Sequence, residues 1–143
     1  YFCTNINIMY GLKVSGMQMV TESPEMTIAK FISKLFYYQT AVKFFHLKVT
    51  GSGSYATHTA LNDLYESLSD ICDSLTETSQ TESILELTHE KVCSCDVSKD
   101  TIMELCEFVK SNRYVFVESF QRNMIDTLEE TIALTKYKLK FLS

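Results

Sequence analysis

Two histidines and two carboxylates near the middle of the chain have the types and spacing of a metal site. His46 and His58 are twelve residues apart, and Asp73 and Glu77 follow His58 by fifteen and nineteen residues. Imidazole nitrogens and carboxylate oxygens together are typical ligands of iron, zinc and related metals. The pattern therefore predicts a protein that binds a transition metal.

The residues around the two histidines predict a helix hairpin. Gly51-Ser52-Gly53 lies between the histidines and is typical of a tight turn. Helices are predicted on either side of it, over residues 24–49 and 54–79, so that the two imidazoles face each other across the hairpin. The start of the first helix is indicated by Ser23, Pro24 and Glu25.

The two acidic residues cannot reach the histidines within one chain. Asp73 and Glu77 are four residues apart on the second predicted helix and therefore share a face. From His58 to Asp73 the helix rises about 22 Å, which is far more than the separation of two ligands of one metal. A two-fold axis that runs two copies of the second helix antiparallel would bring the histidines of one subunit to the acids of the other.

The same residues resemble the ferroxidase motif of the mini-ferritins, the DNA-protection-during-starvation (Dps) branch of the ferritin-like superfamily. That motif reads His-x11-His-x3-Asp-x10-Asp-x3-Glu and is shared across a two-fold interface. His46, His58, Asp73 and Glu77 match it, and Asn62 stands at its middle acid. The segment 46–77, which begins HLKVTG, is also similar to the family's His-Trp-x-Val-x-Gly turn and the acidic helix after it, with Leu47 in place of tryptophan.

The resemblance implies oxidation of Fe(II) to Fe(III) at the two-fold interface and storage of iron inside a hollow shell. It also implies a homo-oligomer with two-fold interfaces, which has twelve subunits in a standard mini-ferritin. In that site His46 and His58 are neutral donors, whereas Asp73 and Glu77 are anionic ligands from the opposing subunit. Asn62 supplies no charge, so a weakened second iron position is expected. Zinc could occupy the same ligands as a surrogate.

Composition and periodicity predict an all-α fold. The chain has 143 residues, of which 45% are hydrophobic and 22% charged, with four glycines and one proline. Further helices are predicted over residues 99–112 and 117–141, and a long crossover over 80–97 is typical of a ferritin-like four-helix bundle. Residues 1–22 are interpreted as an N-terminal extension and 23–143 as the bundle. The predicted core seam of the second helix is Leu61, Leu64, Leu68, Ile71 and Leu75.

Aromatic residues surround the first predicted helix. They leave apolar surface on more than one face, which indicates that a second face is covered and favours an oligomer. These residues are Phe31, Phe36, Tyr37, Tyr38, Phe44 and Phe45.

Charge and cysteine content narrow the classes of function and the compartment. A net charge of −5 and a pI near 5.2 oppose nucleic-acid binding, and no apolar run is long enough to span a membrane. An odd number of cysteines without framework spacing favours free thiols and a cytoplasmic or intracellular viral location rather than secretion. Cys93 and Cys95 with His89 could bind zinc, and Glu86-x-x-His89 matches one half of a di-iron motif.

Two other classes of function remain open. The first is a non-catalytic structural or assembly protein that uses the same bundle without turnover. A looser similarity, carried by the overall size and the C-terminal helix around Tyr137-Lys138-Leu139, connects the chain to small ferritin-like proteins of phages and large viruses. The second class is a DNA-protecting binder, which the acidity and the lack of a lysine-rich N-terminal tail disfavour.

Overall fold

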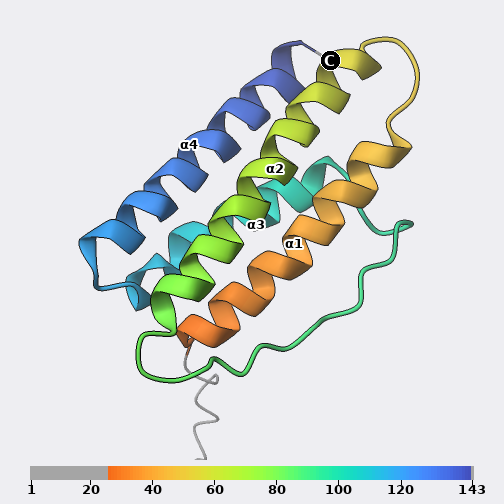
Figure 1. Ribbon diagram of the computed structural model, residues 1–143. Helices are drawn as coiled ribbons and strands as arrows, with labels where there is room; N and C mark the ends of the chain where they lie inside the picture. The colour runs from red at the N-terminus through yellow and green to blue at the C-terminus, as the bar shows by residue number, and fades with distance from the viewer. Residues whose placement is uncertain (1–25, 143) are drawn as a thin grey trace, which may run out of the picture.

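Four helices account for most of the described part of the chain (Figure 1). The structure is a computed structural model and describes residues 26–142. Helix α1 spans Ile28–Lys48, α2 Ser54–Ser79, α3 Lys99–Asn112 and α4 Ser119–Phe141, and a short 3-10 helix, η1, spans Arg113–Val115. The prediction of an all-α fold is confirmed, and the bounds of α2 and α3 agree with those expected. None of these helices is long and apolar enough to cross a membrane.

The first helix begins later than predicted. Met26 and Thr27 are not helical, and Thr27 caps α1 because its hydroxyl accepts a hydrogen bond from the Lys30 amide at 3.3 Å. This cap lies just before Phe31 and Ile32, the first fully buried side chains of the helix. The expected start at 24 is therefore wrong. The predicted N-terminal extension lies outside the described residues, as do Ser23, Pro24 and Glu25, which indicated the helix start in the sequence.

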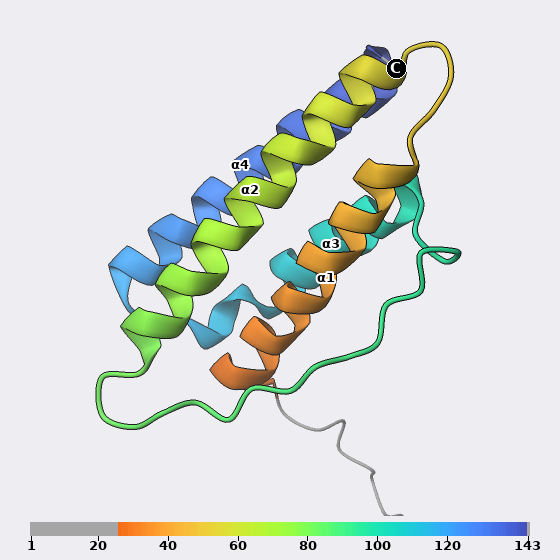
Figure 2. The ribbon, with the colours of Figure 1, turned by 45° about the vertical axis from the view of Figure 1, so that its right-hand side comes forward.

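A long loop over residues 80–98 determines how the helices are connected. The loop passes along the outer side of α1, from the end of α2 to the start of α3, so α2 and α3 run in the same direction (Figures 1 and 2). Helix α1 packs against α2 and α3, and α4 packs against the same two helices. The loop is attached to α1 where Lys34 pairs with Glu90 at 2.7 Å and the Thr88 amide donates to the Ser33 hydroxyl at 2.9 Å.

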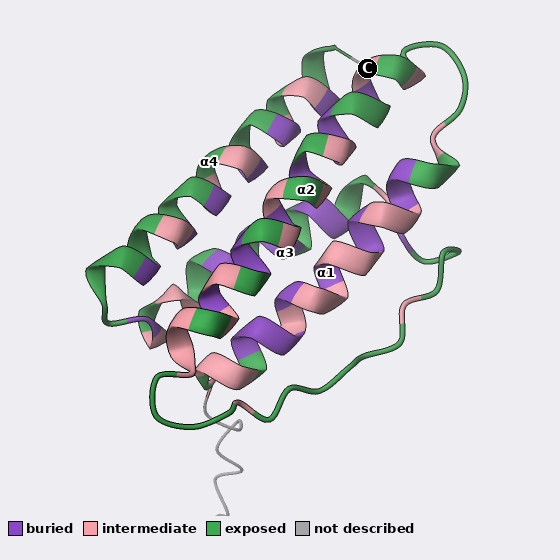
Figure 3. Cartoon of the chain, viewed as in Figure 1, coloured by how far each residue is buried: buried purple, intermediate pink, exposed green. Residues whose placement is uncertain are grey.

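The apolar core lies where the inner faces of the four helices meet (Figure 3). The predicted seam of α2 is confirmed, because every one of its five residues is buried. Residues at steps of three and four along a helix share one face, so this burial follows from their spacing. At the ends of the core, Arg113 donates to both Asp126 and Glu129 and thereby ties η1 to α4.

Half of the aromatic side chains of α1 are buried within the chain. Phe31 lies 4.9 Å from Phe108 and 5.0 Å from Phe116 between ring centroids, and Tyr38 lies 5.6 Å from Phe108. Phe108 belongs to α3, and Phe116 directly follows η1. Lys34 also stacks over the ring of Tyr37 at 4.0 Å. Three of the aromatic residues remain only partly buried, so the covering of a second face by a partner chain stays a prediction; they are Phe36, Tyr37 and Phe44.

Candidate metal centre

His46 and His58 meet at the hairpin between α1 and α2. His46 lies in the last turn of α1 and His58 near the start of α2, and their ring centroids are 3.8 Å apart with an interplanar angle of 34°. The turn between them needs left-handed backbone at Gly51, with φ of 96°, and at Gly53, with φ of 76°. The sequence-based expectation that the imidazoles face each other is confirmed.

The two imidazoles differ in their surroundings. His58 is exposed, whereas only 7% of the surface of His46 is accessible. Neither Nδ1 nor Nε2 of His46 has a hydrogen-bond partner among the described residues. Because buried polar atoms are nearly always partnered, two unpartnered nitrogens in one buried ring indicate a missing partner. A metal ion bound to one of these nitrogens in the plane of the ring is one group that would supply it.

Burial lowers the pKa of His46 below its ordinary value of 6.5, and the nearby His58 and Lys43 lower it further. The neutral imidazole is the form that coordinates a metal. The influence of Lys43 on the pKa of His46 could not be predicted from the spacing of the histidines. Its ammonium lies 4.2 Å from the ring centroid of Tyr65. Burial therefore favours the neutral form of His46, which is the form that a metal ligand needs.

The lowered pKa of His46 has a consequence for stability in the absence of metal. As pH falls below about 6.5, the unfolded chain takes up a proton that folded His46 resists, so the free energy of unfolding is expected to decrease. His46→Leu removes this group and should flatten that part of the pH profile. Urea unfolding at about pH 5.5 and about pH 7.5 measures the difference, and equal pH dependence in both proteins would contradict the expectation.

The predicted acidic ligands lie on the same helix as His58 but far along it. Asp73 and Glu77 are exposed on α2, and at about 1.5 Å of rise per residue Asp73 is about 22 Å from His58. Neither carboxylate makes a hydrogen bond or an ion pair within the described part of the chain. The structure therefore places the two histidines near the start of α2 and the two acids near its end, and their joining in one metal site between two subunits stays a prediction.

The remaining candidate metal ligands have less support from the structure. Asn62 lies one turn after His58, and its amide donates to the Glu66 carboxylate at 2.7 Å. Glu86 and His89 are exposed in the loop over 80–98. Within residues 26–142, the grouping of metal-ligating atoms that the fold brings together is a different one, Cys93, Cys95 and Asp96.

Cys93 and Cys95 are joined by a disulfide, so the expectation of free thiols at these two positions is wrong. The two cysteines lie close together in a single turn and can therefore pair, although the odd number of cysteines in the chain favoured free thiols. Cys72 and Cys106 are free and buried. As a disulfide the pair cannot act as the zinc site that its spacing with His89 suggested.

Comparison with known proteins finds no family model, no curated protein and no solved structure that matches this chain.

Proposed function

We propose that this chain binds Fe(II) at a site assembled between two subunits and oxidises it to Fe(III), as a Dps-like iron-storage protein. The observation that carries the proposal is the buried His46 ring, whose two nitrogens have no hydrogen-bond partner within residues 26–142 and which lies against the exposed ring of His58. Two imidazoles paired at the end of a hairpin supply nitrogen ligands and need anionic ligands from elsewhere to complete an iron site.

The connectivity of the helices supports a ferritin-like bundle. Such bundles have one long crossover between the second and third helices, and here the loop over 80–98 leaves α2 and α3 parallel. In agreement with this connectivity, α1 and α4 each pack against both α2 and α3. The bundle presents the outer face of α2, with His58 near one end and Glu77 near the other, to a second subunit.

Exposed apolar side chains beside the histidines support burial of this region in an interface. Leu47 is 66% exposed and Tyr55 is 83% exposed, on the two sides of the hairpin turn. Large apolar side chains clustered on a surface favour contact with another protein. A two-fold axis near the middle of α2 would place this hairpin beside Asp73 and Glu77 of the second subunit and would cover both side chains.

The chemistry follows from the ligand types. The carboxylates of Asp73 and Glu77 are hard, anionic donors, which favour Fe(III) over Fe(II) and so lower the free energy of the oxidised state. His46 and His58 complete the coordination without adding charge. Dioxygen or hydrogen peroxide takes the electron that each Fe(II) loses. Since Asn62 is neutral and engaged with Glu66, one iron should bind more weakly than in a site with a third acid.

The test is an Fe(II) titration with optical detection of Fe(III), after each protein has been sized by light scattering. Saturable oxidation is expected for the wild type and a loss of at least about tenfold for Glu77→Ala, because metal sites lose this much when a group that holds the metal is removed. Glu107→Ala, which removes an exposed acid from α3, is the matched control and should oxidise iron normally. Equal oxidation by the wild type and Glu77→Ala would contradict the proposal.

A non-catalytic assembly protein is the second candidate, and the surface of α4 favours it. Leu134, Tyr137 and Phe141 are each more than half exposed and recur at helical spacing along one face. An apolar stripe of this kind supports contact between subunits without any metal. On this alternative, the intact oligomer takes up no iron in the titration, and its size is unchanged by chelators.

A further inference from the structure

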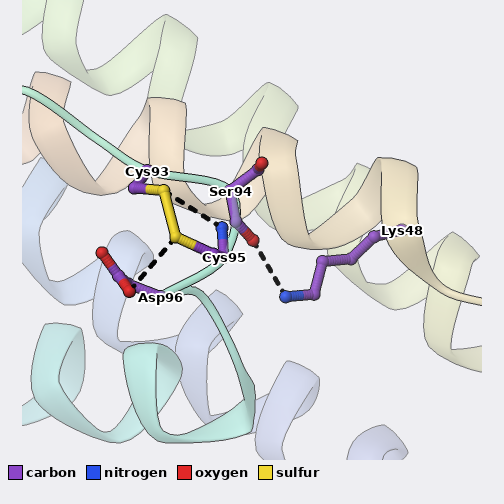
Figure 4. Close-up of a disulfide and its surroundings, with 5 residues drawn as sticks. All are labelled: Lys48, Cys93, Ser94, Cys95 and Asp96. Atoms are coloured by element: carbon purple, nitrogen blue, oxygen red, sulfur yellow. Dashed lines mark hydrogen bonds between the residues drawn. A yellow bond between two sulfur atoms is a disulfide. The ribbon is translucent and has the colours of Figure 1, made fainter.

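We infer that Cys93 and Cys95 form a thiol–disulfide exchange site, in which Cys93 exchanges with small thiols and Cys95 is the resolving cysteine. This activity is separate from the iron site proposed above. The observations behind it are the position of the disulfide, the contacts of its two sulfurs, and the turn that carries them (Figure 4).

The disulfide does not connect parts of the fold. Its cysteines are two residues apart in one turn of the loop over 80–98, so it joins no helix to another. The stabilisation that a disulfide gives by restricting the unfolded chain grows with the length of the loop it closes, and this loop is very short. Both cysteines are exposed. An accessible disulfide with little structural role is suited to exchange.

The two sulfurs have different polar contacts. The backbone N–H of Cys95 donates to Cys93 Sγ at 3.4 Å, and such a donor stabilises a thiolate on Cys93 once the bond opens. In contrast, Cys95 Sγ lies 3.4 Å from Oδ1 of Asp96. A carboxylate disfavours a thiolate and can accept a hydrogen bond from a thiol, so reduced Cys95 should hold its proton.

This asymmetry assigns the steps of exchange. In the reduced protein the Cys93 thiolate attacks an external disulfide, an S–S bond forms to Cys93, and one external thiolate leaves with the electron pair. Cys95 then loses its proton to solvent and attacks Cys93 Sγ, which releases the second external thiolate and closes the ring. The balance is one protein dithiol and one external disulfide giving one protein disulfide and two thiols, and the reverse reaction passes through the same adduct on Cys93.

The turn is held by contacts that do not depend on the disulfide. The amide of Asp96 donates to the carbonyl of Cys93 at 3.1 Å, and the ammonium of Lys48, in the last turn of α1, donates to the carbonyl of Ser94 at 2.9 Å. After reduction these bonds keep the two sulfurs near each other. Because each thiol then stays close to the other, the disulfide can form again after reduction.

The other described cysteines serve as internal references. Cys72 and Cys106 are buried, and burial raises the pKa of the Cys72 thiol to about 12. Both should stay unmodified in the native protein, so that any exchange in the described part of the chain is confined to the turn.

The test equilibrates the wild-type protein with buffers of reduced and oxidised glutathione, in the presence of a chelator. The products are trapped with acid and an alkylating reagent and mapped by peptide mass spectrometry. The disulfide content at equilibrium is expected to follow the glutathione ratio. When the reduced protein is instead mixed with oxidised glutathione and trapped early, the glutathione adduct should form on Cys93 in preference to Cys95, because the thiolate is the attacking form. A disulfide that does not respond to any ratio, or an adduct divided equally between the two cysteines, would overturn the inference.

The variant Asp96→Asn tests the role given to the carboxylate. The preference of the glutathione adduct for Cys93 should fall, because the carboxylate that disfavours a thiolate on Cys95 has been removed. Asp100→Asn, a change of the same kind four residues further on, should behave as the wild type. An unchanged preference in Asp96→Asn would contradict the assigned roles. Repeating the mapping with zinc and no chelator provides a further check, since zinc that protects both reduced cysteines from glutathione would identify a metal site instead.

Discussion

Subunits carrying His58→Ala, mixed with subunits carrying Asp73→Ala, are expected to recover about a quarter of wild-type Fe(II) oxidation, although each variant alone has lost it. A shared site takes its histidines from one chain and its acids from another. In a random mixture the histidine half is intact in about half of the sites and the acidic half in about half of those, which leaves about a quarter with both.

The mixture separates a shared site from a site within one chain. Equal amounts of the two variants are dissociated, reassembled together and assayed by optical detection of Fe(III), and native mass spectrometry confirms that mixed oligomers have formed. A mixture of His46→Ala with His58→Ala is the matched control, because no chain in it carries both histidines and no site can be complete. No recovery in confirmed mixed oligomers would rule out the two-fold site.

Replacing Phe31 with alanine is expected to lower the free energy of unfolding by about 3–5 kcal/mol. Phe31 is fully buried and holds α1 against α3 through Phe108 and against the segment before α4 through Phe116. Removal of the ring leaves a cavity where three segments meet, and these segments cannot all move inward. The loss is a large share of the stability of an ordinary domain, which is about 5–15 kcal/mol.

Urea unfolding followed by circular dichroism, at one protein concentration for all proteins, measures this effect. Tyr114→Ala is the matched control, because Tyr114 is 63% exposed in η1, and its change should stay within about 0.5 kcal/mol. A loss of less than about 1 kcal/mol for Phe31→Ala would show that the aromatic cluster is not a main element of the core.

Several local features of this protein could be predicted from the sequence because they depend on short-range interactions. The bounds of α2 follow from the glycine turn before it and from apolar residues that repeat at helical spacing. The start of α3 follows from Ser98, whose hydroxyl accepts from the Asp100 amide while Thr101 accepts from the Ser98 amide. The meeting of His46 with His58 follows from the turn that joins their helices.

The start of α1 shows where local signals are not enough. Ser23 and Thr27 are both residue types that cap helices, and they lie four positions apart. Either could therefore begin a helix with the same apolar face. The cap in the structure is Thr27, next to the first side chains that enter the core. Where two local solutions are of similar free energy, the burial of apolar surface decides between them.

The chain's own sequence determined its helical class, the long connection between α2 and α3, and the hairpin that brings two imidazoles together, since each depends on neighbours in the chain. Only the tertiary structure decided that Phe31 packs against Phe108 of α3 and against Phe116, and that neither nitrogen of His46 has a hydrogen-bond partner within residues 26–142. It also decided that the Asp96 carboxylate lies 3.4 Å from Cys95 Sγ. These features depend on which surfaces meet across the fold, and residue spacing along one helix carries no information about the side chains on another.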